Sequence, residues 1–206
     1  MENTLGLMLA GGLARRMGGG DKARIKIGGM TILQRVLGCL GPQCSGIIIN
    51  ANGDPARFDD TGLPVVADSV PDFPGPLAGI LAGLDWAAAN APANEWLLSV
   101  PGDCPFLPND LAVRLHQART AAGTRLACAR SGEWRHPTVG IWPVALRGDL
   151  RHALVEENLH RVELWTAQYG IAIADWPDKP IDPFFNVNTP EDAARAETLA
   201  AQIQTT

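Results

Sequence analysis

The sequence predicts a single-domain α/β protein, a three-layer α/β/α sandwich with a mostly parallel sheet. Short apolar runs alternate along the chain with segments of helical periodicity, which is the pattern of βαβ units. Each run ends near a Gly, Pro, Asn or Asp residue, which favours a turn. With 206 residues, 46% of them hydrophobic and 19% charged, the chain fits one globular domain over residues 1–206.

The predicted strands are the short apolar runs, whose continuous hydrophobicity is typical of strands buried on both faces. In chain order they cover Leu5–Ala10, Gly46–Asn50, Pro64–Ala67, Trp96–Val100, Arg125–Ala129, Thr138–Trp142 and Ile171–Ala174. The polar segment Ser131–Pro137, which contains Gly132, is predicted to form the tip of a hairpin. It would add an antiparallel excursion to the sheet.

The predicted helices lie between these strands and carry apolar residues at helical spacing. They cover Thr31–Leu40, Leu77–Ala89, Asp110–Ala122 and a last segment that ends near Ile203. The start of the last helix is defined by Thr189 as N-cap and Pro190 at the first helical position. Two acidic residues follow, which complement the helix dipole.

Composition restricts the class of function. The net charge of -5 and the pI near 5.3 argue against binding to nucleic acid, which requires a basic surface. The apolar stretch Leu5–Ala10 is too short for a membrane span or a signal peptide. The four cysteines form no C-x-x-C pair, so we expect reduced thiols in a cytoplasmic protein, and the scattered histidines indicate no metal site.

The segment directly after the first predicted strand is the strongest indication of chemistry. Residues 9–22 read L-A-G-G-L-A-R-R-M-G-G-G-D-K, and five glycines and five basic residues lie between Gly11 and Lys26. Glycines allow backbone N–H groups to approach phosphate oxygens closely, and Arg and Lys add positive charge. Because open α/β sheets bind ligands at the carboxyl ends of their strands, this loop is a candidate phosphate site.

The same loop has an ordinary alternative, a solvated glycine loop whose arginines face water. It lacks the G-x-x-x-x-G-K-[ST] pattern of a Walker A loop. It also lacks the G-x-G-x-x-G fingerprint, which argues against an NAD-dependent oxidoreductase.

Three further polar groups follow predicted strands. Asp103 lies in Gly102-Asp-Cys-Pro105, where its carboxylate could bind a hard cation such as magnesium or only close an Asx turn. Asp68 precedes a Pro-Gly-Pro segment that enters a helix. Asn186 and Asn188 would point to one face of an extended segment, although Asn188 could instead only shape the entry of the last helix.

Together these motifs resemble the molybdenum cofactor guanylyltransferase family, within the nucleotidyltransferases of Rossmann-like, nucleotide-diphospho-sugar transferase-like fold. The resemblance runs from Leu9 to Asp192. It is carried by the loop at 9–22, N-A-N at 50–52, Asp68, P-G-P-L at 74–77, G-D-C-P at 102–105, H-P-T at 136–138 and N-V-N-T-P at 186–190. The opening L-A-G-G is common to many nucleotidyltransferases, whereas its ordered combination with R-R-M-G-G, P-G-P-L and N-V-N-T-P is much more specific.

The resemblance implies transfer of GMP from GTP to the terminal phosphate of molybdopterin, with or without molybdenum, which gives molybdopterin guanine dinucleotide and pyrophosphate. It assigns GTP to Leu9, Ala10, Gly11, Lys22, Asn50, Asp68 and Asp103, and magnesium to Asp103. It assigns the pterin substrate to Arg16, Gly19, Gly75, Arg161, Asn186 and Asn188. Lys22, Asp103 and Arg16 would be the catalytic residues, and proteins that deliver the pterin and mature molybdoenzymes would be partners.

The chain departs from the family around Arg161, where it reads Asn-Leu-His-Arg-Val instead of the expected Gly-Glu-Arg-Arg-Val. Two alternatives remain open at this stage. One keeps the fold and changes the substrates, as in a cytidylyltransferase or a sugar-phosphate nucleotidyltransferase. The other is a catalytically inactive nucleotide-binding partner protein, which we would expect to lack Lys22 or Asp103, and both are present.

Overall fold

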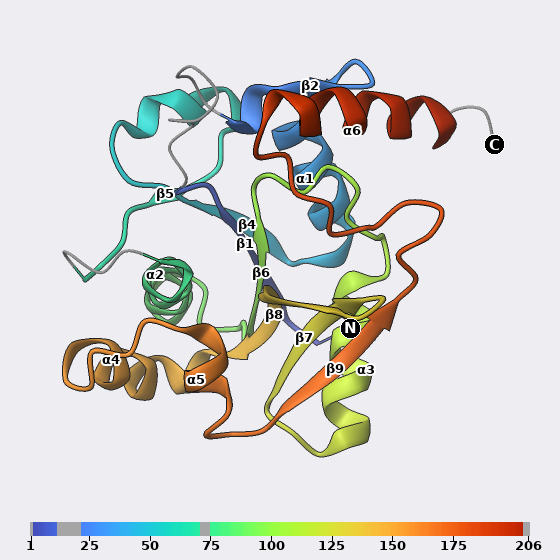
Figure 1. The fold of residues 1–206 in the computed structure, drawn as a ribbon. Coiled ribbons are helices and arrows are strands. Elements are labelled where there is room, and N and C mark those ends of the chain that lie inside the picture. The colour runs from blue at the N-terminus through green and yellow to red at the C-terminus, as the bar shows by residue number, and fades with distance from the viewer. Residues whose placement is uncertain (1, 12–21, 71–74, 204–206) are drawn as a thin grey trace.

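The computed structural model describes residues 2–11, 22–70 and 75–203. Its main sheet has seven strands in the order β5-β4-β1-β6-β8-β7-β9 (Figure 1). The strands are β1 (Thr4–Leu9), β4 (Gly46–Asn50), β5 (Val65–Val66), β6 (Trp96–Pro101), β7 (Leu126–Ser131), β8 (Trp134–Pro143) and β9 (Ile171–Trp176). All seven predicted strands are therefore present.

The predicted antiparallel excursion is β8, which pairs antiparallel with both β6 and β7, while the other pairs in the sheet are parallel. The predicted hairpin tip at Ser131–Pro137 was too long. Ser131 pairs with Trp134, so only Gly132 and Glu133 form the turn, and residues 134–137 belong to β8. Gly132 has a φ of 53°, which glycine adopts without strain and which permits this tight turn.

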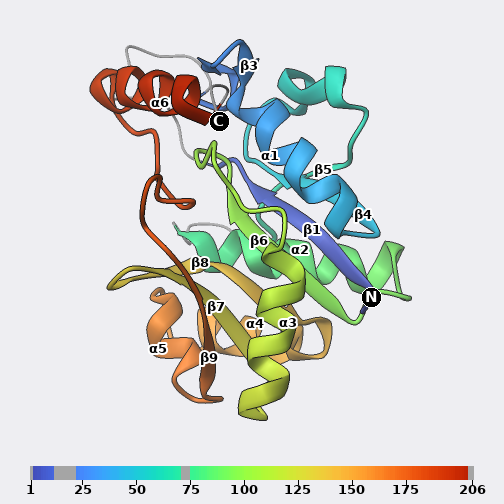
Figure 2. The ribbon, with the colours of Figure 1, turned by 90° about the vertical axis from the view of Figure 1, so that its right-hand side faces the viewer.

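Helices cover both faces of the sheet (Figure 2). On one face lie α2 (Pro76–Asn90), α4 (Arg147–Val155) and α5 (Val162–Thr166). The other side holds α1 (Ile32–Leu40), α3 (Leu111–Ala122) and α6 (Pro190–Ile203), which packs against the hairpin of β2 (Lys26–Ile27) and β3 (Met30–Thr31). Short 3-10 turns complete the described chain: η2 (Lys22–Arg24), η3 (Gly41–Gln43), η4 (Pro55–Thr61) and η5 (Val144–Leu146).

Alternation of side chains along the central strands produces two hydrophobic cores. In β1, Leu5 and Leu7 pack with α2, while Met8 packs on the opposite face with α1. Leu97 and Leu98 of β6 divide between the two cores in the same way. A strand that buries both faces must be apolar throughout, which explains why these runs were visible in the sequence. No helix in the described ranges has both the length and the apolar character that a membrane span requires.

Helix caps fix where the two helices nearest the carboxyl edge of the sheet begin. Thr31 accepts a hydrogen bond from the backbone of Gln34, whose side chain accepts one from Thr31 N–H, a complete capping box. The predicted N-cap of α6 is confirmed, because Thr189 Oγ1 accepts from the N–H of Asp192 at 3.2 Å. Asp192 returns a contact to Thr189 N–H at 2.9 Å.

Two glycines of α2 let the helix lie directly on the sheet. A Cβ at Gly79 would lie 2.3 Å from Asn50 Oδ1, and a Cβ at Gly83 would lie 2.8 Å from Leu7 Cδ2. The first neighbour is a buried amide held by hydrogen bonds, whereas the second is the end of a flexible side chain. Gly79 therefore determines how closely α2 approaches Asn50 at the end of β4.

This difference predicts the effect of alanine at the two positions. Gly79→Ala should destabilise the protein by about 1–3 kcal/mol because Asn50 must shift from its hydrogen bonds. Gly83→Ala should cost less, since Leu7 can repack and alanine has the higher helix propensity. Urea denaturation of both variants measures the difference. Equal midpoints would contradict the assignment of Gly79 as a packing constraint on Asn50.

Candidate nucleotidyltransferase site

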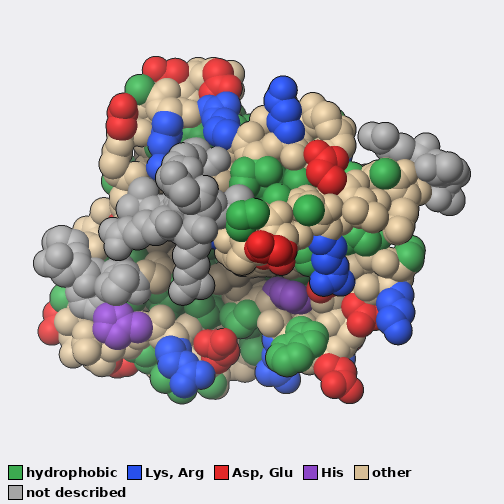
Figure 3. Space-filling model, turned by 45° about the horizontal axis from the view of Figure 1, so that its top comes forward, with side chains coloured by type: hydrophobic (Ala, Val, Ile, Leu, Met, Phe, Trp, Pro, Cys, Tyr) green, Lys and Arg blue, Asp and Glu red, His purple; other side chains and the backbone are tan. Residues whose placement is uncertain are grey.

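The candidate site lies where the chain reverses its direction across the sheet. From β1 the chain adds β4 and β5 on one side and then returns through α2 to β6 on the other side of β1. Such a switch point is where open α/β sheets bind ligands. A cleft of about 90 Å³ lies here, lined by Leu9, Ala10, Lys22, Ala23, Pro101, Gly102 and Asp103. Figure 3 shows a hollow across this side of the molecule, with charged side chains on its rims.

Backbone hydrogen bonds hold the end of β1 between its neighbours. Leu9 is in register with Asn50 of β4 and with Pro101 of β6. Ala10 N–H donates to Asn50 O at 2.8 Å, and Gly102 N–H donates to Leu9 O at 2.9 Å. A Cβ on Gly102 would approach Leu9 O to 3.1 Å, so glycine permits this close contact.

Asp103 follows Gly102 and is held by the backbone on its other side. Its carbonyl accepts a hydrogen bond from Val187 N–H at 2.9 Å. Burial raises the pKa of the Asp103 carboxyl, and the charge of Lys22 lowers it by a smaller amount. The ionised carboxylate is thus incompletely compensated by the protein, and a cation beside it would relieve that cost.

Lys22 joins this site to the segment before α6. Its Nζ donates a hydrogen bond to Asn188 Oδ1 at 2.7 Å. The two residues are 166 positions apart in the sequence, so only the fold brings them together. The side chain of Asn188 therefore contacts Lys22, while the cap of α6 is supplied by Thr189.

The extended segment 186–188 has the alternation that its sequence predicts. Val187 is completely buried, and Asn186 and Asn188 lie on the opposite face. Asn186 Oδ1 accepts from Cys104 Sγ at 3.3 Å. The segment thereby lies along the Asp103–Cys104 turn, and Asn188 contacts the cleft through Lys22.

A second cluster of amides and a carboxylate lies beside the end of β4. Asn50 Nδ2 donates to Asp68 Oδ1 at 2.9 Å, and Asn52 Nδ2 donates to Asp68 Oδ2 at 2.7 Å. Asp68 N–H donates in turn to Asn52 Oδ1 at 2.9 Å. Sequence reasoning included Asn50 and Asp68 but gave Asn52 no role. The N-A-N spacing was the available signal, because residues two apart on an extended segment share a face.

Of the other residues assigned to the pterin, the structure describes Gly75 and Arg161. Arg16 and Gly19 lie outside the described residues. Gly75 has a φ of 135°, which favours glycine, and precedes α2. A Cβ there would lie 3.9 Å from His160 O, so Gly75 is next to the segment that leads into Arg161. Arg161 is exposed at the start of α5, and no contact joins it to Lys22 or Asp103 among the described interactions.

The donors of the site fit a hard divalent cation held jointly with phosphate. Among the described residues no group of three or more His, Cys, Asp or Glu side chains could hold a metal. Magnesium commonly uses one or two protein carboxylates together with substrate phosphates. Asp103, an incompletely compensated carboxylate that lines the cleft, matches that chemistry.

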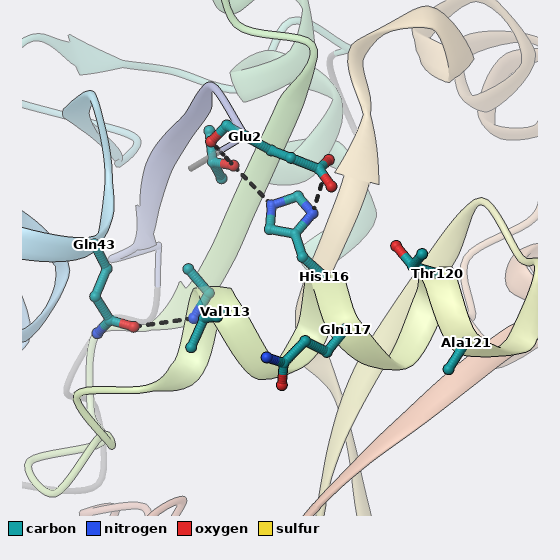
Figure 4. A pocket seen from close by; sticks show the side chains of 9 residues that line it. Glu2, Gln43, Val113, His116, Gln117, Thr120 and Ala121 are labelled. Carbon is teal, nitrogen blue, oxygen red and sulfur yellow. Dashed lines mark hydrogen bonds and ion pairs between the residues drawn. The ribbon is translucent and has the colours of Figure 1, made fainter.

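A larger cavity of about 450 Å³ lies beside the start of β1, against α3 (Figure 4). Its polar groups contact one another: His116 Nε2 lies 2.8 Å from Thr4 Oγ1, and Glu2 lies 3.2 Å from His116 Nδ1. Burial lowers the pKa of His116, so the imidazole favours its neutral form. The cavity contains none of the residues predicted for the site.

The cysteines do not add chemistry to the site. All four are free thiols, and Cys39, Cys104 and Cys128 are buried. Burial raises the pKa of Cys39 to about 11 and that of Cys44 to about 12, so neither is a thiolate at neutral pH.

Comparisons with known proteins identify the family of this chain. Residues 6–175 match the model of the MobA-like NTP transferase domain. The chain is 62% identical, over 96% of its length and 95% of the relative's, to a molybdenum cofactor guanylyltransferase of Nitrobacter hamburgensis.

Two solved structures share the fold. Molybdopterin-guanine dinucleotide biosynthesis protein A of Archaeoglobus fulgidus has a TM-score of 0.73 at 20% identity, over 96% of this chain and 99% of that one. Rv0371C of Mycobacterium tuberculosis, solved as a complex with manganese, has a TM-score of 0.66 at 17% identity, covering 95% and 98%.

The switch-point cleft and the fold define a nucleotidyltransferase of the nucleotide-diphospho-sugar transferase fold. With its high identity to named relatives over nearly its whole length, the chain belongs to the molybdenum cofactor guanylyltransferase family.

The environment of Asp103 predicts opposite effects of one substitution on stability and activity. Burial raises the pKa of the Asp103 carboxyl in the folded state. Ionisation of this carboxyl therefore destabilises the fold as the pH rises from the ordinary value of 3.8 through the raised pKa. Asp103→Asn should therefore raise the stability of the metal-free protein at neutral pH. The same change should reduce turnover by roughly a hundredfold or more if the carboxylate binds the metal.

Urea denaturation with and without Mg²⁺, together with steady-state rates, checks both effects. Added Mg²⁺ and GTP should stabilise the wild type more than the variant. A folded Asp103→Asn protein with normal turnover and an unchanged magnesium requirement would contradict the assignment.

Proposed function

We propose that this protein transfers GMP from GTP to the terminal phosphate of molybdopterin. A phosphate oxygen of the pterin attacks the α-phosphorus of GTP, and the bond from that phosphorus to the α,β-bridging oxygen breaks. Pyrophosphate leaves with the electron pair of that bond. The products are molybdopterin guanine dinucleotide and pyrophosphate, as the names of the relatives suggest.

The observation that carries the proposal is the contact between Lys22 and Asn188 at the cleft beside Asp103. Lys22 is assigned to the triphosphate and Asn188 to the pterin. Their hydrogen bond of 2.7 Å supports a site in which the donor and acceptor phosphates meet. Positioning two substrates in this way removes much of the entropic barrier to reaction.

The chemistry requires little from the protein besides positioning and charge compensation. The attacking phosphate is already ionised near neutral pH, so no general base is needed. Magnesium bound at Asp103 would neutralise charge on the α-phosphate and on the departing pyrophosphate. The manganese complex of the mycobacterial structural neighbour supports a divalent cation in this fold.

Lys22 provides a mobile positive charge for the triphosphate, and the N–H groups that follow β1 provide donors without added charge. Asp68, oriented by Asn50 and Asn52, presents acceptor oxygens to donors of the base or ribose. Arg16, Gly19, Gly75, Arg161, Asn186 and Asn188 remain assigned to the pterin. Partner proteins that deliver the pterin or receive the product, and a cytoplasmic location, stay predictions.

The direct test supplies the protein with Mg²⁺, molybdopterin and each nucleoside triphosphate in turn, and measures pyrophosphate release. GTP should give the highest kcat/KM. Equal or better turnover with CTP would replace the proposal with a cytidylyltransferase. Pyrophosphate release that needs no molybdopterin but requires a sugar phosphate would indicate a sugar-phosphate nucleotidyltransferase. Binding without turnover would indicate an inactive partner protein.

Replacement of Lys22 tests the triphosphate assignment. Lys22→Ala removes a charged hydrogen bond and should cost on the order of 2 kcal/mol in kcat/KM for GTP. Lys26→Ala is the matched control, since Lys26 is an exposed lysine of the same basic segment, on β2. Unchanged kinetics in folded Lys22→Ala would assign Lys22 to the solvated surface.

Replacement of Asn188 separates a role in substrate binding from a role in helix entry. Asn188→Ala should raise the KM for molybdopterin by about tenfold, because Asn188 is assigned to that substrate. The KM for GTP should rise by less, because Lys22 loses only one positioning contact. Thr189→Ala is the control, because loss of the N-cap should cost about 1 kcal/mol of stability without altering either KM. If Asn188→Ala changes only thermal stability, its assignment to the pterin is wrong.

A further inference from the structure

The segment η4 contacts the chain on both sides of the glycine-rich loop. Arg57 Nη2 donates a hydrogen bond to Ala10 O at 2.9 Å, directly after β1. Asp60 forms an ion pair of 2.5 Å with Arg24, which lies in η2 just after Lys22. Arg24 also donates a hydrogen bond to the carbonyl of Arg57. One short segment therefore contacts the last residues of β1 and the turn that carries Lys22.

A buried aromatic ring anchors this arrangement to the core. Phe58, the centre of η4, is fully buried in the same core as α1. The Arg57 guanidinium carbon lies 4.7 Å from the centre of its ring, and that of Arg24 lies 5.9 Å from it. Stacking on a fixed ring restricts both guanidinium groups, so their hydrogen bonds cost less side-chain entropy.

Because the peptide bond is planar, the Arg57 contact with Ala10 O also determines the direction of the Gly11 N–H. In a trans peptide the C=O and N–H groups point in opposite directions. Because Ala10 O points at Arg57, the Gly11 N–H in the same peptide points away from Arg57. Gly11 is exposed, and among the described residues no atom lies within 4 Å of a Cβ added to it. The Gly11 N–H is thus a donor whose direction is set by the Arg57 contact with the same peptide.

Charge strengthens that donor as well as orienting it. A hydrogen bond from a guanidinium to a carbonyl is charge-assisted and polarises the peptide unit to which the carbonyl belongs. The polarised unit carries more positive charge on its N–H, which favours an anionic acceptor. A phosphate bound at the Gly11 N–H would thereby be linked to Arg57 through the Ala10–Gly11 peptide.

We propose that Arg57 is a positioning residue for the nucleotide, which orients and polarises the Gly11 N–H toward a phosphate of GTP. The Arg24–Asp60 pair performs the matching task on the other side, where it holds η2 and so the backbone of Lys22. The inference rests on the proposed function. It adds three residues of η4 and η2 to which sequence reasoning gave no positioning role, although Arg24 was counted in the basic loop.

The first experiment compares Arg57→Met with Arg57→Lys. Methionine can still pack on Phe58 but donates no hydrogen bond, so the KM and Kd for GTP should rise about tenfold while the KM for molybdopterin is unchanged. Lysine can donate to Ala10 O and should recover part of the affinity. Arg119→Met is the matched control, because Arg119 stacks on Trp96 with 3.7 Å from its guanidinium carbon to the ring centre, beside the large cavity. It should lose stability without a change in the KM for GTP.

The second experiment exchanges the charges of the other pair. Arg24→Asp and Asp60→Arg should each raise the Kd for GTP severalfold, and the double variant should recover part of the affinity, because the ion pair is restored in reverse whereas the Arg24 hydrogen bond to Arg57 O is not. A purely structural role would change stability in all three variants and leave the Kd for GTP unaltered. If Arg57→Met fails to fold, Arg57→Lys still tests the hydrogen bond to Ala10 O, while the exchange tests the Arg24–Asp60 pair by itself.

Failure of the inference and failure of the proposed function give different results. If the wild type binds GTP and transfers GMP but folded Arg57→Met has a normal Kd for GTP, Arg57 is not a positioning residue and the function stands. If the wild type prefers another nucleotide, the proposed function is wrong, and the Kd for that nucleotide tests the same residues. Full recovery of affinity by Arg57→Lys would retain the hydrogen bond and reject the need for a guanidinium.

Discussion

The hydrogen bonds around the end of β1 are the constraint on which the candidate site depends. Ala10 N–H binds Asn50 O, and Leu9 O accepts from Gly102 N–H, so three strands end together. Parallel strands place their carboxyl ends at one end of the sheet, and the cleft lies there, at the switch point between β1 and β6. Without this register, Asn50, Lys22 and Asp103 would have no common position.

Close packing around that edge comes from glycines placed where side chains would collide. Gly102 lets β6 turn beside Leu9 O, and Gly79 lets α2 lie against Asn50. At both positions a larger residue would be more stabilising locally but would prevent the close approach to Leu9 O or to Asn50. Such loss of stability is common at functional sites. The site therefore depends as much on the residues without side chains as on the charged residues themselves.

The electrostatics of the site are local. The chain as a whole carries a net charge of -5, yet Lys22 lies beside Asp103, and two arginines stack on Phe58 near the loop. Lys22 brings positive charge to the cleft, while the ionised Asp103 carboxylate is only partly compensated by it, which suits a cation beside Asp103. The larger cavity beside His116 differs, because Glu2, the carboxylate in its lining, is paired with Arg119.

The sequence by itself determined the strands, the main helices and most residues at the cleft. Strands such as β1 and β6 are buried on both faces, so their hydrophobicity is continuous and visible, and Thr189 and Pro190 mark a helix start by local chemistry alone. The hairpin turn was placed less well, since polar residues 134–137 resemble a loop although they pair in β8. Tertiary structure alone decided which distant residues meet. The contacts Lys22–Asn188, Asn52–Asp68 and Arg57–Ala10 join segments between 16 and 166 positions apart, and no local pattern encodes such pairs because each depends on the register and stacking of the whole sheet.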